Sequence, residues 1–461
     1  DRLDEADRPA PLAVANPYRG LQRFESDHRA LFFGREPDIW RVVELMCERR
    51  LVILAGASGV GKSSLVRAGV LPQIVDAGLG RQRRFEVCTI VPGPHPLTAF
   101  AQGLARRFGA EISSDSEAND DTIDTSWSLE RDIREELERR DWVGLRRRLR
   151  QSETGTVLFF DQLDELITLG DHHQAEILAE AMGSLVAERT PGVRVLATVR
   201  TDMLAELASL PGLGPLVERA IHVVAPLGPR AMRDVITLPA RAAGVRFESE
   251  AMIDELVAAV SHSQGGLPLL QFALAQLWES RRDQVISREA LTAIGGVEGA
   301  LARHADQVVD ALLPETRAAA RAVLLDLITR RGTRTRVARI DLEAGQRGRG
   351  EALEALIRGR LVVTGEADGR AVCEIAHEAL VISWPRLAGW LEEESGVQAL
   401  KQRLIRAAQD WHEGGRAGDT LWGRSSLRAV QGLGPDALGS IERAFLAASQ
   451  RAAIRSRLWA V

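Results

Sequence analysis

The sequence is poor in cysteine and lysine and has no long apolar run. Its 3 cysteines, Cys47, Cys88 and Cys373, are far apart and form no CxxC pair. That spacing excludes a zinc ribbon and a disulfide framework and fits a reducing cytoplasm. No uninterrupted apolar stretch approaches the roughly 18 residues that span a bilayer, and the polar first residues lack the apolar core of a signal peptide. We therefore expect a cytoplasmic protein with no membrane partner.

An excess of positive charge is also missing. The 59 Lys and Arg residues face 64 Asp and Glu residues, a formal net charge of −5, so nucleic acid is not an expected partner. Only Lys62 and Lys401 are lysines, and a preference for GC-rich codons explains why the other basic residues are arginines. Because lysine is so rare in this chain, the sequence around Lys62 is more informative. At roughly 150 residues per domain, the length indicates about three domains. The chain lacks an initiator Met, so we expect a piece of a longer protein.

Apolar runs alternate with helical patterns in the first half of the chain. Runs at 51–56, 85–91, 157–160, 193–200 and 220–224 predict short buried strands. Strands that alternate with helices over 50–225 predict a parallel, doubly wound α/β sheet. Between them, the acidic, Ser-, Asp- and Asn-rich stretch 111–128 predicts an exposed loop, and 129–151 predicts one charged helix.

The second half is mainly helical. Helical patterns cover 229–243, 249–262 and 268–282. Helices near 304–330 and 351–359 precede two alternating strands within 361–376, an order typical of a winged helix. Beyond 397 the pattern is helical to the end.

One motif carries chemistry. Gly56-Ala-Ser-Gly-Val-Gly-Lys-Ser63 matches G-x-x-x-x-G-K-[ST] and lies between a buried strand and a helix, the context that a P-loop requires. Its backbone N–H groups and the helix N-terminus bind phosphates, Lys62 reaches the β- and γ-phosphates, and the Ser63 hydroxyl binds Mg²⁺. The predicted phosphate-binding residues are Gly56, Ser58, Gly59, Val60, Gly61, Lys62, Ser63 and Ser64.

Polar residues at the ends of two other strands complete the predicted site. Asp161 follows an apolar strand, where a second Mg²⁺ ligand is expected. Asp164 and Glu165 are alternative residues for orienting or deprotonating the attacking water. Arg200 ends the strand VLATVR and is a candidate sensor of the γ-phosphate; the alternative is a structural arginine paired with Asp202.

Six ordered segments resemble the STAND class of bacterial signal-transduction ATPases, specifically the novel STAND type that is often fused to WD40 repeats. They are NPYRGLQRFESDHRALFFGRE, GASGVGKSSLVRAGVLP, LFFDQLDEL, ATVRTDML, GGLPLLQFALAQLW and IAHEALVISWPRLAGWL, within about residues 16–450. The resemblance implies an AAA+/STAND-like P-loop NTPase fold, and with it a division into a lead-in (1–33), a nucleotide-binding domain (34–225), a helical lid (226–299), a winged helix (300–396) and a C-terminal helical segment (397–461).

The resemblance also implies roles for residues that spacing alone leaves undecided. Phe33, Gly34 and Arg35 match the family's adenine-side motif, and Pro268 matches the lid proline that packs on the base. His377, which spacing alone favours as a structural histidine, matches the winged-helix histidine that contacts the β-phosphate of ADP. Arg200 matches the sensor arginine. The implied cofactors are ATP or ADP and Mg²⁺.

The expected function is a nucleotide-gated switch that hydrolyses ATP slowly and self-associates on activation. Slow hydrolysis is expected because motor-type AAA+ proteins have a glutamate where this chain has Gln162. An N-terminal effector and a C-terminal sensor, for which WD40 repeats are a candidate, are expected outside this chain. One alternative is a DNA-binding regulator that reads DNA with 351–360, although this segment has more acidic than basic residues. Another is a silent nucleotide-binding scaffold.

Overall fold

The computed structural model describes residues 15–80, 84–113, 121–150, 154–187, 192–261, 266–329, 332–345, 347–367, 370–417, 420–430 and 439–458. The chain forms two compact units. The first consists of Asp1–Leu327 and Arg334–Trp384, and the second of Ile328–Thr333 and Pro385–Val461. No helix of the described residues is long and apolar enough to cross a membrane.

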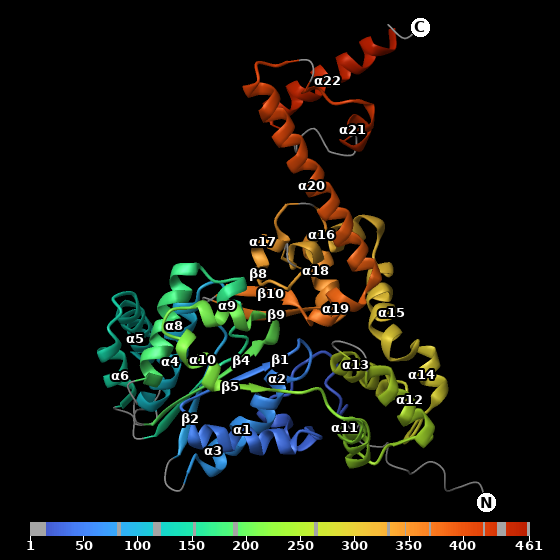
Figure 1. Cartoon of the computed structure of the whole chain (residues 1–461). Helices are drawn as coiled ribbons and strands as arrows, with labels where there is room; N and C mark the ends of the chain where they lie inside the picture. The colour runs from blue at the N-terminus through green and yellow to red at the C-terminus, as the bar shows by residue number, and fades with distance from the viewer. Residues whose placement is uncertain are drawn as a thin grey trace, which may run out of the picture. The chain divides into compact units, whose positions relative to one another are not determined.

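Five parallel strands form the central sheet of the first unit, in the order β2-β3-β4-β1-β5 (Figure 1). They are β1 (Leu51–Gly56), β2 (Phe85–Ile90), β3 (Gly155–Phe160), β4 (Val193–Arg200) and β5 (Ile221–Val223). Along the β1–β4 pair, Gly56 lies opposite Arg200. The start of the P-loop and the candidate sensor therefore lie side by side at the carboxyl edge of the sheet, where ligands of open α/β sheets bind.

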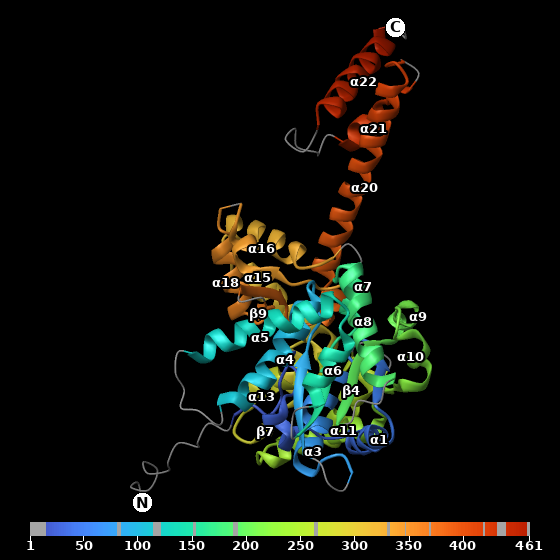
Figure 2. The same ribbon diagram turned by 90° about the vertical axis from the view of Figure 1, so that its left-hand side faces the viewer.

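Helices cover both faces of this sheet, because successive side chains of a buried strand point to opposite faces. In β1, Leu51, Ile53 and Ala55 pack into one core, whereas Val52 and Leu54 pack into the other. The first core takes its helices from α4 (Pro96–Ser113), α5 (Asp121–Glu138), α6 (Trp142–Arg150), α8 (His172–Ala187), α9 (Leu204–Ser209) and α10 (Gly214–Ala220). The second takes α1 (Glu36–Glu48), η2 (Leu65–Val70) and α3 (Leu71–Ala77). Figure 2 views the unit from the side of α4, α5 and α6.

Two of the sequence predictions for this layer are wrong. Helix α4 extends to Ser113 and α5 begins at Asp121, so 111–113 and 121–128 are helical, and 114–120 lie outside the described residues. The helix predicted over 129–151 is divided into α5 and α6. Arg140 adopts a left-handed φ of 55° that no α-helix accommodates, and the Asp141 carboxylate accepts a hydrogen bond from the Gly144 N–H and starts α6.

A helical region follows β5. It contains α11 (Pro229–Ala242), β6 (Arg246–Phe247), α12 (Glu250–Ser261), α13 (Gly266–Glu279), β7 (Val285–Ile286) and α14 (Arg288–Ala293). The segment around Tyr18 is attached to it: Tyr18 is buried, donates a hydrogen bond to the Ile236 carbonyl of α11 and packs edge-on against Trp278 of α13. The segment after residue 15 is thus tied to this helical region before it reaches the sheet.

A small antiparallel sheet ends the first unit. Its strands, in the order β8-β10-β9, are β8 (Val337–Ala338), β9 (Val362–Ala367) and β10 (Arg370–Ile375). Its helices are α15 (Gly296–Asp310), α16 (Pro314–Asp326), α17 (Arg339–Glu343), α18 (Arg349–Arg358) and α19 (Glu378–Ser383). β9 and β10 are the two strands predicted within 361–376, and β8 is a third that the sequence pattern did not indicate.

The second unit contains α20 (Pro385–Glu413), α21 (Arg424–Ala429) and α22 (Ser440–Leu458) around a core of its own that includes Leu404, Trp411 and Phe445. Helix α20 runs across the boundary predicted at 396/397, as α15 runs across the one at 299/300. The division into lid, winged helix and C-terminal segment stays a prediction.

Candidate functional site

The P-loop connects the end of β1 to α2 (Lys62–Ser64). Gly59 and Gly61 have φ values of 77° and 93°, so both positions favour glycine. Lys62 Nζ donates to the carbonyl oxygens of Gly56 and Ala57 at 2.8 and 3.0 Å. Burial lowers the pKa of Lys62, although the charges of Asp164 and Asp161 oppose that change. The loop has the backbone curl, the helix N-terminus and the ammonium group that a phosphate chain requires.

The residues predicted to hold Mg²⁺ are in contact. Ser63 Oγ donates to Asp161 Oδ1 at 2.6 Å, and Thr198 Oγ1 of β4 donates to the same oxygen at 2.8 Å. Mg²⁺ is held in nucleotide sites by one or two protein oxygens together with phosphates. A hydroxyl and a carboxylate oxygen at this distance, beside the P-loop, fit that requirement.

Two arginines that the sequence analysis missed hold the other oxygen of Asp161. Arg67 Nε lies 2.9 Å and Arg23 Nη1 lies 3.2 Å from Asp161 Oδ2, and Arg67 also pairs with Glu25. Burial opposes ionisation of Asp161, but Arg67 and Arg23 outweigh it and lower the pKa of this carboxyl below its ordinary value. Asp161 is therefore ionised, as a metal ligand must be.

The structure separates the two candidate bases, Asp164 and Glu165. Asp164 Oδ1 accepts the backbone N–H of Arg200 at 3.3 Å, and its charge acts on Lys62. Burial raises its pKa, against the charges of Lys62 and Arg200. This arrangement places Asp164 beside Lys62 and Arg200.

Glu165 points to a different neighbourhood. Its Oε2 accepts the Gly93 N–H at 3.1 Å, and its Oε1 lies 3.5 Å from Arg336 Nη2, just before β8. Arg336 also pairs with Glu374 of β10 at 3.2 Å. Burial raises the pKa of Glu165 to about 7, and Arg336 opposes the increase. Glu165 thus connects the turn after β3 to the small sheet.

Arg200 makes both of its ion pairs at the sheet edge. It binds Asp202 at 2.8 Å, the pairing expected of a structural arginine, and Glu378 Oε1 of α19 at 2.6 Å. The second oxygen of Glu378 accepts a hydrogen bond from Ser58 Oγ in the P-loop. Glu378 is a third residue of the candidate site that the sequence analysis missed, after Arg67 and Arg23; its only signal was its place directly after His377.

His377 precedes α19 and caps it. Its Nδ1 accepts the Ala379 N–H at 3.0 Å. Burial, assisted by the charges of Arg334 and Arg23, lowers the pKa of His377 to about 3. The ring is therefore neutral at pH 7, and because Nδ1 is an acceptor, its single hydrogen is on Nε2.

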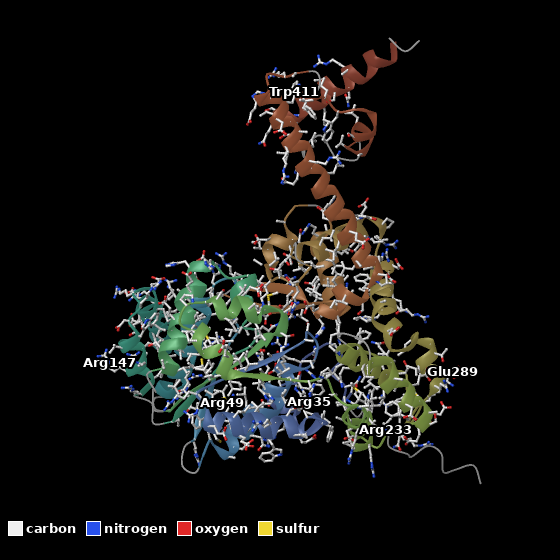
Figure 3. The ribbon with its side chains drawn as sticks, in the orientation of Figure 1. Arg35, Arg49, Arg147, Arg233, Glu289 and Trp411 are labelled. Atoms are coloured by element: carbon white, nitrogen blue, oxygen red, sulfur yellow. The ribbon has the colours of Figure 1, made fainter. Side chains whose placement is uncertain are left out.

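Arg35, one of the adenine-side candidates, lies where the sheet meets the helical region (Figure 3). The buried guanidinium of Arg35 donates to the carbonyl oxygens of Val60 in the P-loop and Ala225 after β5, at 2.8 and 2.9 Å. Gly34 has a φ of 80°, and a β-carbon there would come within 2.7 Å of the Ala231 carbonyl of α11. Phe33, half-buried, immediately precedes this pair.

Helix α13 reaches the P-loop at its first turn. A β-carbon at Gly61 would come within 3.4 Å of Leu267 Cδ2, and Pro268 is the next residue, half-buried. Nearby, Ser64 Oγ accepts the Phe24 N–H at 3.2 Å and so binds the beginning of the chain to α2. The sequence-predicted site residues other than Glu165 are therefore close to the P-loop. They lie on the loop itself, on an element that contacts the loop, or at the edge of the sheet where the loop begins.

Solved structures with a similar arrangement have low sequence identity. The Aeropyrum pernix ORC1 protein, solved in complex with DNA, is 14% identical with a TM-score of 0.40, and the match covers 80% of this chain and 94% of that one. A Walker-type ATPase of Pyrococcus abyssi is 16% identical with a TM-score of 0.37, covering 78% and 98%. Drosophila ORC bound to DNA is 14% identical with a TM-score of 0.40, covering 83% and 95%.

No curated protein matches the chain. The family comparison is more informative, because the Novel STAND NTPase 1 model matches residues 17–419, which contain the P-loop, Asp161, Arg200 and His377. The chain therefore belongs to the Novel STAND NTPase 1 family of P-loop nucleotide-binding proteins.

Proposed function

We propose that this chain is the core of a cytoplasmic, nucleotide-gated switch. ADP is held by the P-loop, Pro268 and His377 in the resting form. ATP, together with a stimulus received by a sensor outside this chain, moves the small sheet and α19 away from the P-loop and exposes a surface for self-association. Slow hydrolysis of ATP returns the switch to its resting form, and the output is the activity of a fused effector. This is a two-state element biased by the γ-phosphate.

The observation that carries the proposal is the contact between α19 and the P-loop. Glu378 joins Ser58 to Arg200, so a nucleotide bound at the P-loop has the small sheet and α19 as its neighbours. Leu267 of α13 lies against Gly61 on the same loop. The phosphates of a bound nucleotide would thus be close to three parts of the first unit: the P-loop with its sheet, α13 and α19. A switch controlled by those phosphates requires such an arrangement.

His377 supplies a hydrogen bond to the nucleotide of the resting form. The ring is neutral and carries its hydrogen on Nε2, because Nδ1 accepts from Ala379. A neutral Nε2–H donates to a phosphate oxygen without adding a charge that varies with pH. We assign this donor to the β-phosphate of ADP.

Hydrolysis uses the groups at the sheet edge. Lys62 binds the phosphates, Ser63 and Asp161 hold Mg²⁺, and Mg²⁺ when bound neutralises phosphate charge. Asp164 is the base that orients the water, since it lies beside Lys62 and Arg200 while Glu165 is bonded to Gly93 and Arg336. Arg200 is the γ-phosphate sensor. Gln162, in place of a second carboxylate after Asp161, keeps the rate low.

The clamp is tested by the dissociation rate of a fluorescent ADP from the full chain. We expect His377→Ala to release ADP roughly tenfold faster or more, because a hydrogen bond to a charged group is lost. Light scattering on the same variant with Mg²⁺ and ATPγS should show assemblies larger than those of the wild-type chain with ADP.

Two variants make that test specific. His412→Ala, on α20 in the second unit, is the matched control and should leave the ADP rate unchanged. Lys62→Ala should abolish binding of both nucleotides, and tight binding by it would contradict the assignment of the site. An unchanged ADP dissociation rate in His377→Ala would exclude the clamp.

A further inference from the structure

The carboxylate of Glu378 connects three parts of the chain that are remote in sequence. It starts α19, accepts a hydrogen bond from Ser58, 320 residues away, and pairs with Arg200, 178 residues away. Its side chain is 15% exposed and that of Arg200 is 24% exposed, so water screens this pair only in part. Both hydroxyls of the P-loop thus bond a carboxylate: Ser63 bonds Asp161, and Ser58 bonds Glu378.

The partners of Glu378 are the donors that a phosphate requires. Ser58 is in the loop that binds phosphates, and Arg200 ends the strand beside it. The charge of Glu378 also acts on Lys62, the third cationic or donor group at this edge. Carboxylate and phosphate oxygens use the same donors in the same geometry, and two anions at such a distance repel one another.

We propose that Glu378 determines which nucleotide the site prefers. Its carboxylate occupies the donors of a terminal phosphate, so a nucleoside triphosphate has to displace it, whereas a diphosphate leaves it bound to Ser58 and Arg200. The inference deepens the proposed function, on which it rests.

His377 and Glu378 then act on the phosphates in opposite senses. The neutral imidazole donates a hydrogen bond to a phosphate that is present in both nucleotides, and the adjacent carboxylate repels the phosphate that only the triphosphate has. Because the two residues start the same helix, displacement of Glu378 releases α19 from both Ser58 and Arg200. Binding of the triphosphate and release of α19 from the P-loop are therefore linked. An interaction that favours the released position of α19 raises the affinity for the triphosphate by the same factor by which the triphosphate favours that interaction.

The test is the affinity of the full chain for Mg²⁺–ATPγS and for ADP, measured by titration calorimetry. We expect Glu378→Gln, which keeps the shape and removes the charge, to bind ATPγS at least about fivefold more tightly than the wild-type chain. Its affinity for ADP should stay within about twofold of the wild-type value. Glu378→Ala, which also removes the charge, should likewise bind ATPγS more tightly with little change for ADP, and Glu378→Asp, which keeps the charge, should stay nearer to wild type.

The matched control is Asp202→Asn. Asp202 is the other carboxylate on Arg200, and no hydrogen bond to the P-loop is described for it. If removal of one carboxylate from Arg200 were sufficient, Asp202→Asn would raise the ATPγS affinity as much as Glu378→Gln does. We expect the gain in Asp202→Asn to be less than half as large. A gain that is equal for the two variants, equal for ADP and ATPγS, or absent from Glu378→Gln overturns the inference. Retained ADP binding shows that a variant is folded.

The two proposals fail separately. If Glu378→Gln gains ATPγS affinity but His377→Ala neither releases ADP faster nor assembles, the competition stands and the switch falls. If His377→Ala behaves as expected and Glu378→Gln binds ATPγS no more tightly, the switch stands without this discriminating residue.

Discussion

At the scale of single residues, two adjacent carboxylates differ because their neighbours differ. Asp164 accepts from the Arg200 backbone and faces Lys62, whereas Glu165 is bonded to Gly93 and Arg336. A general base must be within reach of the water that attacks the phosphate. Of the two carboxylates, only Asp164 lies beside Lys62 and Arg200, the residues proposed to bind the phosphates.

Asp164→Asn should therefore slow single-turnover hydrolysis of ATP by about 10²-fold or more, the contribution typical of a general base. Nucleotide affinity should change much less, because the P-loop and Lys62 are intact. Glu165→Gln is the neighbouring control and should stay within about tenfold of the wild-type rate. Equal losses in the two variants, measured by release of phosphate, would reject Asp164 as the base.

The sequence alone predicts the groups that lie within one short segment. The P-loop occupies consecutive residues, and Asp161 and Arg200 each end an apolar run, so strand position alone brings them to one edge. Glu378 and Arg23 reach this edge across 320 and 138 residues, and no spacing rule relates residues so far apart. The sequence pattern also fails to show the break between α5 and α6. The charged pattern continues through Arg140, but the left-handed backbone conformation of this residue separates the two helices.

At the scale of elements, Glu165 couples the turn after β3 to the small sheet and makes that coupling depend on pH. Burial raises its pKa from an ordinary value of 4.5 to about 7. Between these two values the unfolded chain has released the proton while the folded chain retains it. The stability contributed by Glu165 is therefore complete below pH 4.5 and is lost as pH rises to about 7.

Glu165→Gln cannot ionise and should lack this loss. Relative to the variant, the wild-type chain should lose up to about 3 kcal/mol between pH 4.5 and pH 8, a shift of several degrees in Tm. Thermal unfolding of both proteins across that pH range measures the difference between their free energies of unfolding. The contributions of the other titrating groups are common to both proteins and cancel in this difference.

Glu374→Gln is the matched control for that measurement. Glu374 shares Arg336 with Glu165, but Arg334 and Arg336 outweigh its burial and lower its pKa. Its own contribution is therefore present above its unfolded value and lost only below it. Because the charge of Glu374 also raises the pKa of Glu165, this variant should lower that pKa and lose less stability than the wild type between pH 5 and pH 8. A slope that is the same in the wild type and Glu165→Gln would mean that Glu165 is ionised throughout.

At the scale of the whole molecule, the site is assembled from parts that are far apart in the first unit's chain. The beginning of the chain contributes Arg23 to Asp161, α13 brings Leu267 to the P-loop, and α19 brings Glu378. None of these contacts is part of the sheet that holds the P-loop. Under the proposed function, these groups move while the P-loop and the sheet remain folded, so gating is separate from folding.

The second unit has a core that is separate from this machinery. Trp411 and Trp422 pack edge-on against Phe445 at centroid distances of 5.7 and 5.5 Å. Calorimetry of the full chain should accordingly show two transitions. ADP at about 100 times its Kd should stabilise the transition of the first unit by about 2.7 kcal/mol and leave the other unchanged. Trp411→Ala should lower only the second transition, and Lys62→Ala should abolish the shift; one transition that moves as a whole with ADP would show that the two units unfold together.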